Sequence, residues 1–193
     1  MGTFRLQSPA TIIGRATKGL AMTWTLDTVH THVGFAVKHM MVSTARGQFK
    51  SYTGTFNLDP TDFTKSSVEG EIDVASIDTN NPDRDNHLRT NDFFDVANHP
   101  KILFKSTGIK SKGEGEYVVT GDLTIRGVTK SVDLDVEFGG VAKSPYGFQV
   151  AGITARGTID RKDFGVSFSA PLETGGLLLA DKVKIEIEAE LKG

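Results

Sequence analysis

The sequence predicts an all-β protein in which about eight antiparallel strands form a barrel. After Trp24, apolar residues recur at every second position through most of the chain, and the segments with this pattern are mostly ten or more residues long. Such alternation gives each strand one apolar and one polar face. Eight strands of this kind hide their apolar faces in a closed barrel or a sandwich, and their length favours the barrel.

The alternation also places the strands along the chain. In VDLDVEF, Val132 to Phe138, apolar residues alternate with acidic ones, and the final segment KVKIEIEAEL repeats the pattern with lysine and glutamate. The links GEGE and RGV are short and contain glycine, as antiparallel hairpins require. The predicted strands cover residues 24–38, 47–58, 66–77, 101–110, 116–126, 128–138, 147–159 and 182–191.

Two segments interrupt the alternation. KHMMVSTARG, residues 38–47, fits a short helix or a bend. In NNPDRDNHLRTNDFFDVANHP, residues 80–100, Pro82 suits a first helical turn, and residues 83–91 can form about two helical turns. We expect this short helix to cap one end of the barrel.

The remaining composition limits the domain organisation and the location. A chain of 193 residues, 38% of them hydrophobic, is long enough for one domain with a substantial core. Residues 1–22 contain no apolar stretch long enough for a signal peptide, so we expect a flexible arm over 1–22 and a barrel domain over 23–193. No stretch reaches the ~20 apolar residues of a membrane-spanning helix. The expected location is cytoplasmic, or periplasmic or secreted if a signal was removed.

Charge and cysteine content exclude several classes of function. The formal net charge is −2, and acidic and basic residues are interspersed, so neither nucleic acid nor an anionic lipid surface is predicted as a partner. The chain has no cysteine, so a metal site would need histidine and carboxylate ligands. No serine lies in a G-x-S-x-G motif, and no pair of carboxylates stands in a distinctly apolar setting. We predict no catalytic residue, no metal and no cofactor.

The segment 80–100 is nevertheless dense in groups that could carry chemistry. Asp83 and His87 have the i, i+4 spacing with which two residues on a helix can share a metal, but the sequence offers no obvious third ligand. The favoured interpretation is structural: charged side chains pair with each other or with the backbone, and two phenylalanines anchor the segment. The predicted structural cap comprises Arg84, Asp85, His87, Phe93 and Phe94.

Four segments of the chain carry a resemblance to a known family. They read WTLDTVHTHVGFAVKHMMVSTARGQF, DRDNHLRTNDFFDVANHP, GDLTIRGVTKSVDLDV and IDRKDFGV. In this order they resemble the signature segments of the YceI-like family, the polyisoprenoid-binding proteins. The resemblance covers roughly residues 23–192. Four ordered segments are far more specific than any single motif.

The resemblance implies a lipocalin-like barrel, capped by short helices, with an interior tunnel for a long isoprenoid chain. The implied ligand is a polyprenyl quinone or polyprenyl phosphate, and the implied role is its binding, transport or storage without catalysis. Such binding rests on apolar burial, at about 25 cal/mol per Å² removed from water. Apolar residues on the dry faces of the strands are the predicted tunnel wall: Phe35, Val37, Phe49, Phe56, Val74, Phe104, Leu123, Leu134 and Val136.

Other candidates belong to the tunnel mouth. Met40 and Met41 are predicted there because a flexible thioether side chain adapts to a mobile ligand. The loop SFSAPLETGGLLLADKV, residues 167–183, could fold over one barrel end. The candidates for the ligand head group are Asp27, His30, His32, Arg46 and Arg161.

Three alternatives stay open from sequence. Each predicted tunnel residue could equally be core, in which case the protein is a stress-related structural or interaction module with a filled barrel. A metal-dependent hydrolase would use His30, His32, His87 or His99. A homodimer could form through an exposed strand edge or through the apolar loop.

Overall fold

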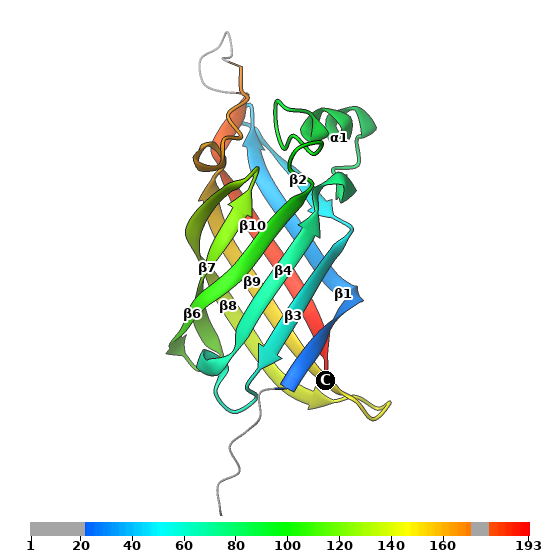
Figure 1. Ribbon diagram of the computed structural model, residues 1–193, viewed down its shortest axis with the longest axis vertical. Helices are drawn as coiled ribbons and strands as arrows, with labels where there is room; N and C mark the ends of the chain where they lie inside the picture. Colours follow the sequence, from blue (N-terminus) through cyan, green and yellow to red (C-terminus); the bar gives the residue numbers. More distant parts are fainter. Residues whose placement is uncertain (1–21, 171–177) are drawn as a thin grey trace, which may run out of the picture.

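Figure 1 shows an elongated barrel of tilted strands with one α-helix at its upper end. This computed structural model describes residues 22–170 and 178–193. All but the last residue of the predicted arm, and residues 171–177 of the predicted loop, lie outside the described residues. The strands are β1 (Met22–His39), β2 (Ser43–Phe49), β3 (Tyr52–Leu58), β4 (Ser67–Asp73), β5 (Ile77–Asp78), β6 (Lys101–Gly113), β7 (Glu116–Ile125), β8 (Val128–Lys143), β9 (Gln149–Asp160) and β10 (Leu179–Lys192).

The strands form one antiparallel sheet that closes on itself. The order around the barrel is β10-β9-β8-β7-β6-β4-β3-β1, and β10 pairs back with β1 along most of its length. Closure removes the edges that an open sheet would leave exposed. The predicted all-β, eight-stranded antiparallel barrel is therefore confirmed.

One of the eight positions around the barrel is shared by two strands. β3 pairs with the first residues of β1, and β2 pairs with its second half. Between them, the amides of Lys50 and Ser51 both donate to the hydroxyl of Ser76, at 3.1 and 3.0 Å. Ser76 belongs to the 3-10 helix η2 (Val74–Ser76). The single strand predicted over 47–58 is thus interrupted.

The upper of these two strands has few partners on its outer side. β2 pairs with β1 over its whole length. On the other side, within the described residues, it pairs only with the two-residue strand β5, at Gln48 and Phe49. Residues 43–47 of β2 therefore have a strand on one side only in the described part of the chain.

The segment predicted as a short helix or bend is a hairpin turn. β1 runs to His39 and β2 begins at Ser43, so only Met40, Met41 and Val42 form the turn and no helix is present there. The alternation was hard to detect in β2 because its inward positions carry small residues, alanine and glycine, in place of large apolar ones.

Short helices complete the two ends of the barrel. The helix α1 (Pro82–Arg89) begins as predicted with proline in its first turn, and the side chain of Asn81 caps it by accepting from the amide of Arg84 at 2.9 Å. The 3-10 helix η3 (Arg161–Phe164) lies at the same end, which we call the cap end. The 3-10 helix η1 (Phe63–Lys65) lies at the opposite end, which we call the closed end.

Candidate ligand-binding cavity

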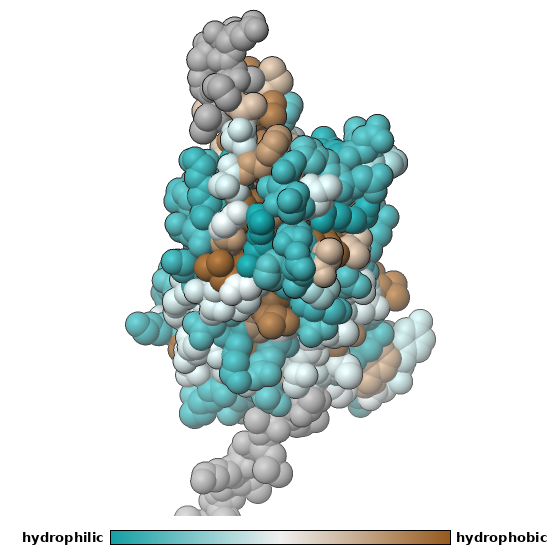
Figure 2. All heavy atoms as spheres, turned by 45° about the horizontal axis from the view of Figure 1, so that its top comes forward, coloured by the Kyte–Doolittle hydropathy of each residue, from teal (hydrophilic) through white to brown (hydrophobic). Residues whose placement is uncertain are grey.

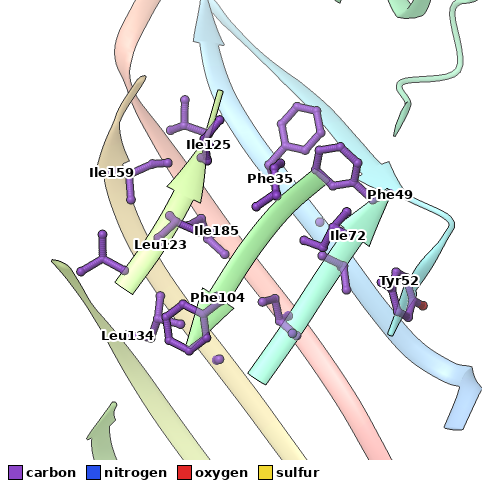
Figure 3. A pocket seen from close by; sticks show the side chains of 18 of the residues that line it. Phe35, Phe49, Tyr52, Ile72, Phe104, Leu123, Ile125, Leu134, Ile159 and Ile185 are labelled. Atoms are coloured by element: carbon purple, nitrogen blue, oxygen red, sulfur yellow. The ribbon is translucent and has the colours of Figure 1, made fainter. Parts of the chain in front are cut away.

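A cavity of about 710 Å³ occupies the barrel interior. Its volume lies within the range typical of small-molecule sites, and its wall is almost entirely apolar. Figure 3 shows side chains from several strands pointing into it. The labelled residues are Phe35, Phe49, Tyr52, Ile72, Phe104, Leu123, Ile125, Leu134, Ile159 and Ile185.

Inward-facing glycines explain why the barrel is hollow. A Cβ atom on Gly47 would overlap the ring of Phe35, one on Gly54 would overlap the ring of Phe56, and one on Gly121 would overlap the ring of Phe104. These glycines sit at positions where a side chain would point into the barrel. Each ring therefore rests against the wall over a glycine, and the centre of the barrel stays open.

The closed end is sealed by aromatic packing. Phe63, from η1, stacks on Phe138 with ring centroids 4.7 Å apart and contacts Tyr117 at 4.6 Å. Trp24 and Leu191 of the same cluster are 1% and 0% exposed. Large apolar side chains with so little exposure fill much of the barrel interior at this end.

The cap end has a different lining. Phe49 packs against Phe94, with ring centroids 6.1 Å apart, but the cavity wall here also includes the exposed residues Arg46, Asp83 and Arg84. Exposed charged residues on the wall mark the place where the cavity meets solvent. We therefore call this end the mouth of the cavity.

Side chains of the predicted cap hold the backbone that leads into α1. The buried carboxylate of Asp85 accepts hydrogen bonds from the amide and the hydroxyl of Thr79. Arg84 donates to the same residue, from Nε to its hydroxyl and from Nη2 to its carbonyl, both at 2.7 Å. Arg84 and Asp85 thus act on one threonine and not, as the sequence also allowed, on each other.

The other cap residues form an aromatic cluster. The ring of His87 meets the rings of Phe93 and Phe168 edge to face, each at 5.1 Å, and its Nε2 lies 2.9 Å from Asp92. Phe93 is buried. Arg126, which the sequence reasoning missed, donates to the carbonyls of Phe93 and Gly165, both at 2.9 Å.

Arg161 is on the cavity wall, but its donors are already used. Its side chain is 6% exposed. Nε donates to the carbonyl of Ala180 at 3.0 Å, and Nη1 donates to the carbonyls of Val166 and Phe168, both at 2.7 Å. This arrangement fixes the chain that follows η3. Among the predicted head-group residues it leaves Arg46 as the wall residue with an exposed guanidinium, 3.4 Å from Glu186.

Asp27 and His30 lie together outside the cavity wall, at an irregularity in the β1–β10 pairing. The carboxylate of Asp27 is 2.7 Å from Nζ of Lys192 and 2.8 Å from Nδ1 of His30. Hydrogen bonds from Lys192 and from His30 hold the pKa of Asp27 well below its usual value, and the bond to Asp27 raises the pKa of His30. Asp27, His30 and Glu190 are close enough to share a metal ion, but the Lys192 ammonium already neutralises Asp27.

The predicted wall residues divide into two groups. Val74 is 1% exposed, packs in the core and is not part of the wall. Met40 and Met41, which were predicted at the tunnel mouth, form the turn between β1 and β2 beside the cap end. His32 is exposed and also lies off the wall. The cavity wall does include Phe35, Val37, Phe49, Phe56, Phe104, Leu123, Leu134 and Val136.

Several wall residues were not among the predicted tunnel residues. Tyr52, Ile72, Ile125, Ile159 and Ile185 all point inward. Alternation had already placed Ile72, Ile125 and Ile185 on the apolar faces of predicted strands. The same parity applied to the predicted strand 147–159 would have found Ile159. Tyr52 is harder to place, since its hydroxyl donates to the carbonyl of Thr31 at 2.6 Å.

Comparisons with known proteins agree with this architecture. The YceI-like domain model matches residues 24–191. A UPF0312 protein of Staphylococcus epidermidis is 44% identical over 165 residues, 85% of this chain and 94% of that protein, and one of Staphylococcus aureus is 40% identical over 168 residues, 86% and 95%.

Solved structures share the barrel. A Campylobacter jejuni YceI protein has a TM-score of 0.72 at 36% identity, with 88% of this chain and 96% of that chain covered. Burkholderia cenocepacia BcnA has a TM-score of 0.74 at 27% identity, with 86% and 98% covered. A polyisoprenoid binding domain from Saccharophagus degradans shares the fold, with a TM-score of 0.64 at 14% identity over 90% and 99%. Among the described residues, no helix has the length and apolar character to cross a bilayer. With a family model matched over nearly the whole barrel and relatives above 40% identity, the chain belongs to the YceI-like family.

Proposed function

We propose that this protein binds a long-chain polyisoprenoid lipid in the barrel cavity and carries or stores it without changing it chemically. The observation that carries the proposal is the size and chemistry of the cavity: about 710 Å³ with an almost entirely apolar wall, packed with aromatic side chains at the closed end and lined by exposed charged residues at the cap end. A long hydrocarbon chain fits such a cavity with its tail toward the closed end and its head group at the mouth.

The energetics suit this class of ligand. Each 100 Å² of apolar ligand surface removed from water is worth about 2.5 kcal/mol. A chain of several isoprene units would therefore bind tightly without any ionic contact inside the barrel. The polyisoprenoid binding domain of Saccharophagus degradans supports the proposal only through its shared fold, at 14% identity.

For the head group, we propose a contact with Arg46. Its guanidinium is exposed on the outer face of β2, where it pairs with the equally exposed Glu186, so this ion pair is weak and a head group that emerges from the mouth would reach it over the rim. A polyprenyl phosphate would replace Glu186 as its partner, whereas a polyprenyl quinone would accept a hydrogen bond from it. Arg84 and Arg161 are poorer candidates because their donors hold the backbone.

The two alternative functions fit less well. A filled barrel does not agree with the cavity. For a metal-dependent hydrolase, the predicted histidines are divided among separate partners: His30 lies beside Asp27, His87 beside Asp92 and His99 near Asp95. Within the described residues, the one group able to supply three ligands lies off the cavity wall.

Solvent extraction and native mass spectrometry of the purified protein test the proposal. We expect a co-purifying isoprenoid, or saturable binding of added polyprenyl lipid. In Ile185→Trp an indole enters the cavity and should abolish this binding, whereas Lys184→Trp places the same group on the outer face of β10 and should not. A wild-type protein that neither contains nor binds polyprenyl lipid would reject the proposed function.

A further inference from the structure

The turn between β1 and β2 exposes three consecutive large apolar side chains. Met40 is 43% exposed, Met41 62% and Val42 84%. We call these three residues the apolar tip. The other exposed large apolar residues in the described part of the chain, such as Val29 and Tyr146, stand singly. Contiguous exposed apolar residues mark an interaction surface more often than single ones do.

The backbone conformation of the apolar tip is also unfavourable for the residues that it carries. Met40 and Met41 have φ angles of 51° and 61°, in the left-handed region. Residues with a Cβ atom pay roughly 1–2 kcal/mol each for this conformation, and Asn or Gly normally occupies such hairpin positions. Two methionines are therefore unfavourable here both for the backbone and for contact with water. Folding of the hairpin does not explain them.

The position of the apolar tip connects it to the cavity. The amide of Met40 donates to the carbonyl of Leu178 at 2.9 Å. Leu178 belongs to the cavity wall. So do His39 and Leu179, which pair with each other at the adjoining ends of β1 and β10. In Figure 2, which brings this end forward, apolar residues gather beside the grey segment while hydrophilic residues cover much of the remaining surface. The apolar surface of the cavity thus continues outward onto the tip.

The charges beside the tip suit the surface of a bilayer. Lys38 is exposed at the end of β1, and the guanidinium of Arg46, 3.4 Å from the exposed Glu186, is exposed on the neighbouring strand β2. Cationic side chains that flank an apolar insertion contact lipid phosphates, and anionic lipids strengthen that contact.

We propose that the apolar tip inserts into the interfacial layer of a lipid bilayer and holds the mouth of the cavity against it. The side chains of Met40, Met41 and Val42 would enter the boundary between head groups and acyl chains, and Lys38 and Arg46 would face the phosphates. A ligand insoluble in water then passes between bilayer and cavity without crossing solvent. The choice of a bilayer as partner rests on the proposed function, because a membrane is where such a ligand dissolves.

Flotation of the full chain with vesicles of phosphatidylcholine and phosphatidylglycerol, free of polyprenyl lipid, tests docking alone. The triple variant Met40→Asn, Met41→Gly, Val42→Ser removes the apolar tip but installs the residues that its backbone favours, so it should fold at least as well as wild type. We expect wild type to float with the vesicles and the triple variant to partition about tenfold or more weakly. Val29→Ser is the matched control, because Val29 and Val42 are both 84% exposed and Val29 lies away from the tip.

Each outcome is informative. Docking that is absent in wild type, equal in the triple variant, or equally lost in Val29→Ser overturns the inference. So does a wild-type dimer in sedimentation that the triple variant abolishes without any vesicle binding, because the tip would then join two copies of this chain. Binding of polyprenyl lipid delivered in detergent is measured in parallel: if wild type floats but binds no such lipid, docking stands and the proposed function fails.

Discussion

The two ends of the barrel are stabilised by different interactions. At the closed end, Phe63, Tyr117 and Phe138 pack ring against ring across the interior. At the cap end, arginines bond to backbone carbonyls outside the regular strand ladders, as Arg126 does with Phe93 and Gly165. An end that admits a ligand cannot be filled with apolar side chains. At the cap end, apolar side chains such as Phe93 and Phe164 pack around the rim, and the arginine bonds to backbone carbonyls hold the segments that carry them.

The largest expected effect tests the closed end. Phe63→Ala should lower the free energy of unfolding by about 3–5 kcal/mol, since it removes a buried ring between two others. Urea unfolding measures the change. Phe63→Leu, which keeps most of the apolar volume, should cost less than half as much. A loss below 1 kcal/mol in Phe63→Ala would show that the aromatic layer does not stabilise this end.

At the cap end, Arg161 provides the corresponding test. Arg161→Ala leaves the carbonyls of Val166, Phe168 and Ala180 without their donor and should cost about 2–3 kcal/mol. Arg161→Lys retains one donor at most and should recover only part of this loss. If Arg161→Ala keeps its stability but loses lipid binding, Arg161 contacts the head group after all.

A smaller effect is expected in the predicted structural cap. In Asp85→Asn the amide oxygen can accept both bonds from Thr79, which reach a single carboxylate oxygen, but the acceptor loses its negative charge, so the free energy of unfolding should fall by about 1–2 kcal/mol. Asp83→Asn is the control for the change of charge, because Asp83 lies two residues before Asp85 in α1 and is exposed. The cap interpretation requires stability to fall before ligand affinity does. Unchanged melting with abolished binding would contradict it.

The smallest expected effect is the pH dependence of stability that arises from Asp27 and His30. Because the folded protein raises the pKa of His30, its pairing stabilises the fold below the ordinary histidine pKa of about 6.5 and is lost as pH rises through the raised value. The lowered pKa of Asp27 acts oppositely, and its contribution is lost only in acid. His30→Gln should therefore melt below wild type at pH 6 and approach it at pH 9. A pH-independent difference, or one that persists in the Asp27→Asn background, would contradict this assignment.

The sequence predicted the wall of the barrel better than its ends. Period-two alternation depends on neighbours in the chain, so it located the eight positions around the barrel and most of the inward residues. The sequence also contains a signal for a hollow barrel. In GTF and GDL, Gly54 and Gly121 occupy positions with the same strand parity as inward apolar residues, so no side chain enters the barrel there.

The ends depend on partners that are distant in sequence. Arg126 and Arg161 donate to backbone carbonyls. Every residue has such a carbonyl, so the sequence does not show which one an arginine will bind. Met40 and Met41 were predicted near the mouth, but their left-handed backbone places them on a turn outside the wall. Asp27 and His30 were predicted as head-group candidates, but an irregularity in the β1–β10 pairing, which left no clear pattern in the sequence, lies where they leave the wall.

The interruption between β2 and β3 has a mechanical consequence. Below it, β3 pairs with β1 at the four residues 22–25 and with β4 over residues 52–57, so widening the barrel there must break strand pairing on both sides of β3. Above it, within the described residues, β2 is joined on its outer side to β5 at Gln48 and Phe49 alone. Bending β2 outward about β1 would disrupt those two pairings and leave the rest of the cylinder intact. The compliance of the barrel is thus concentrated in one half-strand beside the mouth, and a bulky head group can be accommodated there at the cost of two residue pairs.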